Sequence, residues 1–337
     1  MSDRAILLLA GGAGTRLWPL STDENPKQFL RLFDGESLLQ RAYDRVRRVV
    51  APDRIFFATN ERYRGTIREQ LPEALPENIL TEPARRNTAP AIAVAVAEIE
   101  KRLPGVTIGV FPSDHAVGDV DAFLTVVHRA FAFAERSDYL VTLGITPSEP
   151  NTGFGYLELG DELAPGIRKT LRYVEKPTRE RAEELIRHGH VWNGGMFLWK
   201  ASVFRAVLRA AAPDIAEIAE RITFAATDAE KRALYETMPS ISIDFGVMEK
   251  AERVATAPGE FMWSDVGSWS AVARLAPSEG GAILEQATGV YVVSDSGRRI
   301  AVVGLDGVAV VDSTNGLLVV RLEESEAVSE VVKKLRS

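Results

Sequence analysis

The stretch Leu7–Phe29, LLLAGGAGTRLWPLSTDENPKQF, decides the expected fold. It begins inside AILLLA (Ala5–Ala10), a run of six apolar residues closed by two glycines. Such a run is typical of a buried parallel strand, and it is too short for a membrane span or for the apolar region of a signal peptide. The stretch therefore predicts a central strand followed by a flexible turn.

Outward from this strand, apolar runs alternate with segments of helical periodicity. Strands are expected at 54–59, 106–111 and 139–145, and helices at 37–50, 87–103 and 121–137. This alternation predicts an α/β fold, Rossmann-like and layered, with a mostly parallel or mixed sheet. Because ligands of such folds lie beyond the carboxyl ends of the strands, GGAGTR (Gly11–Arg16) and PSDH (Pro112–His115) are expected on one rim.

The pattern changes in the second half of the chain. Strands are expected at 155–160, 167–177 and 191–200, and helices at 202–222 and 228–238. After Ala276, short strand-like pieces are separated by turn signals such as Asp306-Gly307 and Asn315-Gly316, and a helix follows at 324–335. We expect a large domain over residues 1–278 and a small β-rich domain over residues 279–337 that ends in this helix.

Composition excludes several classes of protein. The 337 residues are 46% hydrophobic, which is enough for a large core. There is no cysteine, so disulfides and thiolate metal sites are excluded, and the presence of only four histidines disfavours a His-rich metal site. The net charge of −7 disfavours nucleic acid and anionic membranes as partners. We expect a cytoplasmic protein.

The opening loop has the composition of a phosphate-binding loop but matches neither common pattern. Leu17 stands where the Rossmann fingerprint needs a glycine, and the Gly-Lys-Ser/Thr ending of a Walker loop is absent. Glycines allow backbone N–H groups to approach a phosphate, and Arg16 and Lys27 can neutralise phosphate oxygens. Cations on both sides of a loop suit a triphosphate whose leaving group carries charge.

At this point the sequence resembles a known family, the sugar-1-phosphate nucleotidylyltransferases. The resemblance rests on LAGGAGTRLWPLS…NPKQF, EPARRNTAPAIA, FPSDH, NTGFGY, VEKP, WNGGMF, IDFGVMEK and WSDVGSW, which follow one another from Leu7 to Trp269. It is strongest for the branch that uses GTP and mannose 1-phosphate. It implies that residues 1–278 form a nucleotidyltransferase domain that transfers GMP from GTP to mannose 1-phosphate and releases pyrophosphate.

The resemblance also implies roles for individual residues. Arg16 and Lys27 are the expected catalytic residues, and Asp114 and Asp265 are expected to hold Mg²⁺ together with substrate phosphates. Aspartates at such positions also commonly cap turns or helices, and Asp265 precedes an expected helix. The sugar phosphate is an anion, so in-line attack on the α-phosphorus of GTP needs no general base.

Substrate-binding residues follow from the same resemblance. The nucleotide is expected to contact Ala10, Gly11, Gly12, Gly14, Arg86, Asn87, Ala89 and Ser113. The sugar phosphate is expected to contact Gly155, Glu175, Lys176 and Asn193. Without the resemblance, these segments would indicate an Asn-capped helix, a hairpin turn, an exposed charge pair and an internal amide hydrogen bond. Glu175 and Lys176 point to opposite faces of a strand, so Lys176 reaches the phosphate only if the strand bends near Pro177.

Three alternatives stay open. The first is another nucleotide-sugar pyrophosphorylase, specific for dTDP- or UDP-glucose. The second is a glycosyltransferase with Asp119-Val-Asp121 as its metal motif, although this segment is better explained as a capping turn before a helix. The third is a non-catalytic sensor of sugar nucleotides, which could have lost its metal ligands. We expect a homodimer, because the apolar strands of the tail suggest an interface.

Overall fold

The computed structural model describes residues 3–12, 14–276, 278 and 281–336, without the side chains of Thr15 and Arg336. They form two compact units, each built from several segments of the chain. The sheet unit comprises Met1–Gly11, Asp44–Pro112 and Val117–Trp263. The loop–tail unit comprises Gly12–Tyr43, Ser113–Ala116 and Ser264–Ser337.

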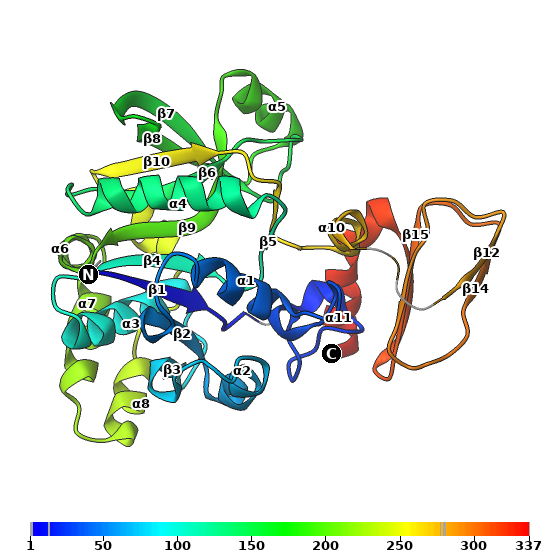
Figure 1. Cartoon of the computed structure of the whole chain (residues 1–337), viewed down its shortest axis with the longest axis horizontal. Coiled ribbons are helices and arrows are strands. Elements are labelled where there is room, and N and C mark those ends of the chain that lie inside the picture. The colour runs from blue at the N-terminus through cyan, green and yellow to red at the C-terminus, as the bar shows by residue number, and fades with distance from the viewer. Residues whose placement is uncertain (1–2, 13, 277, 279–280, 337) are drawn as a thin grey trace. The chain divides into compact units, whose positions relative to one another are not determined.

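The sheet unit contains a nine-stranded sheet of order β3-β2-β1-β4-β9-β6-β10-β8-β7 (Figure 1). The strands are β1 (Arg4–Leu9), β2 (Ile55–Asn60), β3 (Ile79–Glu82), β4 (Thr107–Pro112), β6 (Leu140–Ile145), β7 (Gly155–Ala164), β8 (Ile167–Glu175), β9 (Val191–Lys200) and β10 (Val254–Gly259). β1 to β4 pair in parallel, as do β6 and β10, whereas β9 runs antiparallel to β4 and β6. The predicted mixed α/β sheet is confirmed.

The central strand β1 is buried on both faces, as its apolar run predicts. Ala5 and Leu7 belong to the hydrophobic core on one side, while Ile6 and Leu8, fully buried too, alternate to the other side. In the parallel pairing of β1 with β4, Leu9 lies opposite Pro112. The segments that follow these two strands therefore start at the same edge of the sheet, which confirms the expected common rim.

Helices cover both faces of this sheet. α3 (Thr88–Arg102), α6 (Ala201–Ala211) and α7 (Pro213–Phe224) pack together in one core, and α4 (Val120–Ala134) contacts β6, β9 and β10, as Figure 1 shows. The others are α2 (Arg64–Gln70), α5 (Arg179–Arg187), α8 (Asp228–Glu236) and α9 (Ile243–Gly246), while α1 (Leu38–Val46) crosses the unit boundary. Asp119 caps α4 by accepting from the Ala122 N–H, as expected of a capping turn.

One helix prediction was wrong. The segment expected as a single helix over 202–222 forms two helices, α6 and α7, separated at Ala212. Ala212 has φ −147° and ψ 68°, outside the helical region, and Pro213 is the first residue of α7. The residue before a proline is disfavoured in the helical conformation, so the chain turns at this point.

The loop–tail unit contains β12 (Ile283–Glu285), β13 (Tyr291–Ser294), β14 (Ala301–Val303), β15 (Val308–Ser313) and β16 (Gly316–Arg321). β12 pairs with β14, and a second sheet has the order β13-β15-β16. β15 and β16 form the hairpin that Asn315-Gly316 predicts. The last helix, α11 (Val328–Arg336), begins later than expected because Leu322–Ala327 forms a 3₁₀ helix. α10 (Trp269–Leu275) completes the unit, and the short strands β5 (Ala116–Val117) and β11 (Trp263–Ser264) cross the unit boundaries.

The tail shares a hydrophobic core with the opening loop. Leu17, Leu30 and Phe33 of the loop pack in one cluster with Trp269 and Val311. The Trp269 indole N–H donates to the Trp18 carbonyl at 2.9 Å, and the Asn315 amide donates to the Pro19 carbonyl at 3.2 Å. Because of these contacts, the opening loop and the tail belong to the same compact unit. The division of the chain into two domains at residue 278 stays a proposal. Within the described ranges, no helix has the length and apolarity needed to cross a membrane.

Candidate active site

Lys27 lies at the centre of a charged cluster in the loop–tail unit. Its ammonium is 2.9 Å from Asp114 Oδ2 and donates a hydrogen bond of 2.6 Å to the backbone carbonyl of Asp265. The Lys27 side chain is only 7% exposed, so solvent screens these interactions weakly. Three segments that are far apart in the sequence therefore meet at one buried cation.

Arg16 joins this cluster through a longer contact. Its Nη2 is 3.8 Å from Asp265 Oδ2, and the Arg16 side chain is 52% exposed. A pair with this geometry contributes little to stability. The guanidinium has five N–H donors, so most of its hydrogen-bonding capacity stays available for another anion.

Gly14 makes room for Lys27. A Cβ atom at Gly14 would lie 2.4 Å from Lys27 Cβ, and the residue has φ +54°. Any other side chain at this position would meet both a clash and an unfavourable backbone conformation. Gly14 is therefore required by the packing of Lys27, a reason that the sequence did not reveal.

Asp265 sits in a tight, strained turn. Val266 is fully buried and has φ +50°, a conformation that β-branched residues rarely adopt. Asp265 Oδ1 accepts a 3.1 Å hydrogen bond from the Gly267 N–H, and a Cβ atom at Gly267 would lie 2.7 Å from Asp265 Oδ2. The turn thus fixes both the carboxylate and the carbonyl that binds Lys27. The cap of helix α10 is Ser268 rather than Asp265.

Asp114 is held in its ionised form. Burial alone would raise its pKa, but the charges of Lys27 and His115 and the hydrogen bond from Lys27 together keep the pKa below its ordinary value. His115 Nε2 is 3.7 Å from Asp114 Oδ1. The carboxylate is therefore charged and ready to bind a cation at neutral pH.

The donor set of this cluster fits a hard divalent cation. Asp114 and Asp265 offer carboxylate oxygens, the ligands that Mg²⁺ prefers, and Mg²⁺ commonly takes one or two protein carboxylates together with substrate phosphates and water. In the part of the chain that the structure describes, no three His, Asp or Glu side chains form a metal cluster. A metal bound here would consequently depend on phosphate oxygens to complete its coordination.

The other residues expected at the phosphates are divided between the units. Gly12 and Ser113 belong to the loop–tail unit, whereas Ala10 and Gly11 belong to the sheet unit. The Ala10 N–H donates to the Ala58 carbonyl at 2.8 Å, so this amide already has a partner. A Cβ atom at Gly11 would lie 3.3 Å from Glu82 Oε1, which places the start of the loop beside Glu82.

The segment expected to contact the base lies at the N-terminus of α3. Asn87 has φ +66° and caps α3, with its side chain accepting from the Thr88 N–H. Arg86 donates to the Glu236 carbonyl, which ties it to the end of α8. Ala89 is fully buried and its N–H donates to the Ile241 carbonyl at 3.1 Å. The predicted Asn cap is confirmed, and of the three residues expected at the base Asn87 is exposed, Arg86 is partly exposed and Ala89 is buried.

Glu82 and Tyr235 form a pair beside this segment that sequence reasoning missed. The Tyr235 hydroxyl donates a short hydrogen bond to Glu82 Oε2. Burial raises the pKa of Glu82 to about 7, although the hydrogen bond from Tyr235 lowers it. The only available signal was the position of Glu82 at the carboxyl end of a strand, in the motif EPARRNTAP.

The raised pKa of Glu82 predicts that stability decreases as pH rises. A carboxyl group with a pKa of about 7 when folded and 4.5 when unfolded stabilises the folded state below pH 4.5, and this contribution is lost as pH rises through 7. We expect Glu82→Gln to gain up to about 3 kcal/mol relative to wild type between pH 5 and pH 8. Urea denaturation at both pH values measures this gain, and parallel pH profiles for the two proteins would contradict it.

The four sugar-binding candidates come together in the sheet unit. Gly155 on β7 pairs with Glu175 on β8, and a Cβ atom at Gly155 would lie 2.5 Å from Glu175 Oε2 and 3.7 Å from Asn193 Cβ. Gly155 therefore leaves space for the Glu175 carboxylate. Burial raises the pKa of Glu175, and the nearby Lys176 partly offsets this effect.

Lys176 follows a bend at the end of β8. The strand ends at Glu175, and Lys176 has φ +44°, so its side chain does not continue the alternation of the strand. Its Nζ is 3.6 Å from Glu175 Oε1, and the side chain is 66% exposed. Lys176 was expected to reach the phosphate only if the strand bends near Pro177, and the structure has a bend at this point.

Asn193 is fixed by internal hydrogen bonds. Its Nδ2 donates to Asp244 Oδ1 at 2.8 Å, and its Oδ1 accepts from Thr142 Oγ1 at 3.1 Å. Burial raises the pKa of Asp244, whereas the hydrogen bond from Asn193 lowers it. Asp244 was not singled out from the sequence, although it stands in the motif IDFGVMEK. The structure thus adds a second carboxylate to this group of residues.

These features define the class of protein. The family model for nucleotidyl transferases matches residues 5–279, and the model for the mannoseP isomerase/GMP-like β-helix domain matches residues 284–335. Since the first match covers most of the 337 residues, the chain belongs to the nucleotidyl transferase family and is an enzyme of this kind. Members of this family generally use a divalent metal ion.

Individual relatives within this family carry more specific names. The xanthan biosynthesis protein XanB of Xanthomonas campestris is 38% identical over 100% of this chain and 74% of its own length. The mannose-1-phosphate guanylyltransferase of Klebsiella pneumoniae is 33% identical over 98% of this chain and 73% of its own length. A solved structure from Thermus thermophilus, described as a mannose-1-phosphate geranyltransferase, has a TM-score of 0.89 and 35% identity, and the match covers 99% of this chain and 100% of that one.

Proposed function

We propose that this enzyme transfers GMP from GTP to α-D-mannose 1-phosphate and releases pyrophosphate. The observation that carries the proposal is the cluster in which the buried Lys27 contacts Asp114 and the Asp265 carbonyl, with Arg16 beside it. Such a cluster suits a polyphosphate rather than a neutral substrate. The choice of guanine and mannose rests on the motifs and on the names of relatives such as the Klebsiella pneumoniae enzyme.

In this reaction a phosphate oxygen of mannose 1-phosphate attacks the α-phosphorus of GTP. The new P–O bond forms as the bond between the α-phosphorus and the bridging oxygen breaks, and that oxygen leaves with pyrophosphate. The nucleophile is already an anion, so no side chain has to remove a proton. Catalysis then depends on positioning and on neutralisation of charge.

The cations of the cluster have distinct roles in the proposal. Lys27 is rigid, because it is buried and held by two oxygens, and it offers a fixed positive charge to the triphosphate. Arg16 is half-exposed and contacts the departing pyrophosphate oxygens. Asp114 and Asp265 would hold a divalent ion, Mg²⁺ in our proposal, which would supply further neutralisation of the substrate phosphates.

The remaining substrate contacts are assigned by position. The backbone at Ala10, Gly11, Gly12 and Gly14, together with Ser113, contacts the nucleotide. Arg86, Asn87 and Ala89 lie at the guanine. Gly155, Glu175, Lys176 and Asn193 bind the sugar phosphate. Glu175 accepts hydrogen bonds from sugar hydroxyls, since a carboxylate repels the phosphate, and Lys176 can approach the phosphate.

Removal of the Glu175 charge tests the sugar site. Loss of one hydrogen bond to a charged group costs about 1.5–3 kcal/mol, so Glu175→Gln should raise the KM for mannose 1-phosphate by about 10- to 100-fold while the KM for GTP changes little. Glu158→Gln on the neighbouring strand β7 is the control, because Glu158 makes a surface pair with Arg172. Equal effects on both KM values would contradict a role in the sugar site.

The substrate assignment is tested by a panel of reactions. Each nucleoside triphosphate is supplied with each hexose 1-phosphate and Mg²⁺, and pyrophosphate is measured. We expect the highest kcat/KM for GTP with mannose 1-phosphate. A preference for dTTP or UTP with glucose 1-phosphate would establish the main alternative instead, and ligand binding without pyrophosphate would indicate a sensor.

The homodimer and the cytoplasmic location also stay proposals. Leu317 and Val319 lie on one face of β16, and each is 55% exposed. Exposed apolar residues on a strand are typical of an interface between subunits. Sedimentation equilibrium of the full chain and of Val319→Lys would test whether this face joins two copies.

A further inference from the structure

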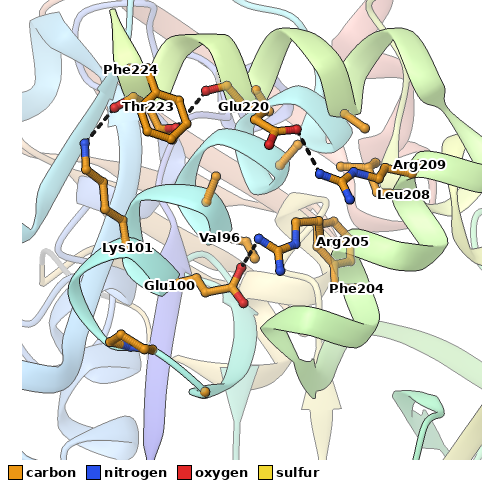
Figure 2. Close-up of a pocket in the computed structure, with 16 residues that line it drawn as sticks. Val96, Glu100, Lys101, Phe204, Arg205, Leu208, Arg209, Glu220, Thr223 and Phe224 are labelled. Carbon is orange, nitrogen blue, oxygen red and sulfur yellow. Dashed lines mark hydrogen bonds and ion pairs between the residues drawn. The ribbon is translucent and has the colours of Figure 1, made fainter.

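A pocket of about 320 Å³ lies in the sheet unit among α3, α6 and α7 (Figure 2). Four small side chains of α3 and α7 line this pocket: Ala93, Ala97, Ala216 and Ala219. Phe204 and Leu208 of α6 provide larger apolar walls and are themselves buried. The interior is therefore apolar and large enough for a small molecule.

The pocket lies away from the proposed substrate residues of the sheet unit. It is lined by α3 from Ala93 onward and by Pro104 and Gly105, which lead into the amino end of β4. Asn87 caps the opposite end of α3, and a helix of 15 residues is about 22 Å long. Because substrates of α/β folds bind at the carboxyl ends of the strands, this pocket is at the wrong end of the sheet to be a substrate site.

The rim of the pocket is charged and carries an excess of cations. Arg205 is 3.4 Å from Glu100, and Arg209 is 2.9 Å from Glu220. Lys101 instead donates to a neutral group, the Thr223 carbonyl, at 2.7 Å. Three cations against two carboxylates give this rim a net positive charge, although the whole chain has a net charge of −7.

An exposed aromatic ring stands beside the uncompensated cation. Phe224, the last residue of α7, is 77% exposed, and Lys101 Nζ is 5.6 Å from the centroid of its ring. Figure 2 shows Lys101 and Phe224 on the same side of the pocket. A ligand with an aromatic body would cover the Phe224 ring and could place an anionic group against Lys101.

We propose that this pocket is a second ligand site, which binds a small aromatic anion with a single ring or two fused rings and one carboxylate. The rings pack against Phe204, Leu208 and Phe224, and Lys101 binds the carboxylate. The size agrees with the volume, because an apolar cavity of about 150 Å³ holds a single benzene ring. The two ion pairs, Arg205–Glu100 and Arg209–Glu220, join the helices around the ligand.

Calorimetric titration of the full chain with 1-naphthoate tests this site. Wild type should bind one equivalent, and Lys101→Gln should weaken binding about tenfold, the effect expected for loss of one charged hydrogen bond. Lys231→Gln, on the nearby helix α8 and outside the pocket, should bind as wild type does. The neutral 1-naphthalenemethanol should bind wild type more weakly than 1-naphthoate does. It should bind Lys101→Gln with the same affinity as wild type.

Two further variants test the apolar part of the site. Ala97→Phe places a ring inside the pocket and should abolish binding, and Phe224→Ala removes an exposed ring and should weaken it without affecting folding. Turnover should be unchanged in both, and thermal denaturation checks that they are folded. No binding of 1-naphthoate at about 1 mM to wild type, equal affinity for the neutral compound, or full binding by folded Ala97→Phe would each overturn the proposal.

Discussion

Replacement of Lys27 by methionine is expected to lower turnover by about 10²- to 10³-fold, the loss typical of one preorganised charge contact. Methionine keeps the buried apolar stem that packs against Gly14 but removes the ammonium that Asp114 and the Asp265 carbonyl hold. The fixed positive charge would then be missing when the bond between the α-phosphorus and the bridging oxygen breaks. Steady-state measurement of pyrophosphate release checks this expectation.

Folding of Lys27→Met is measured separately, because the substitution leaves the Asp114 carboxylate without its buried partner. Loss of one partner of a buried pair commonly destabilises a protein by about 3–5 kcal/mol. Assays are therefore made below the melting transition of the variant. Lys200→Met, which removes a surface pair with Asp138, is the matched control and should retain turnover. A folded Lys27→Met protein with near-normal turnover would remove Lys27 from the mechanism.

Asp265→Asn is expected to have the second large effect. Asparagine keeps a side-chain oxygen for the Gly267 N–H, and the backbone carbonyl that binds Lys27 is unchanged. The substitution thus removes one negative charge with little change of structure. We expect turnover to decrease by about 10²- to 10³-fold and the Mg²⁺ concentration for half-maximal activity to increase.

Asp119→Asn provides the comparison for this second experiment. Asp119 also accepts a backbone hydrogen bond, from Ala122, but it caps α4 and has no role in the proposed site. Its turnover and metal dependence should match those of wild type. If Asp265→Asn showed the same metal dependence as wild type, Asp265 would not be a metal ligand, whatever its effect on turnover.

Much of the sheet could be predicted from the sequence, because its signals are local. The run Ala5–Ala10 predicts a buried strand by composition alone, and Asn87 predicts the start of α3 by capping. The break at Ala212 was missed because the apolar spacing continues across it. Only the conformational restriction by Pro213 ends α6, and its effect was underestimated.

The charged cluster could be predicted only in part. The motifs identified Lys27, Asp114 and Asp265 separately, but the contact of Lys27 with the Asp265 carbonyl joins residues that are far apart in the chain and involves a backbone atom. The positive φ of Val266 depends on tertiary packing, which no sequence pattern reports. Gly267 was missed for the same reason, since its role depends on the position of the Asp265 carboxylate.

The sugar-binding residues show a similar limit. Gly155 was expected to contact the sugar phosphate, and the structure shows that its missing side chain leaves space for the Glu175 carboxylate. The partner of Asn193 could not be chosen from the sequence because Asp244 comes from a distant short helix, α9. Side-chain type predicted which residues need partners, but only the fold determines which partners they have.

The most direct test of the account is a crystal structure of the protein with GDP-mannose and Mn²⁺, which gives an anomalous signal at the metal position. The account predicts a single anomalous peak at about 2.0–2.3 Å from oxygens of both Asp114 and Asp265, with diphosphate oxygens on the same ion and Lys27 in contact with the phosphates. A diphosphate bound away from Lys27, or a metal that touches neither aspartate, would contradict it.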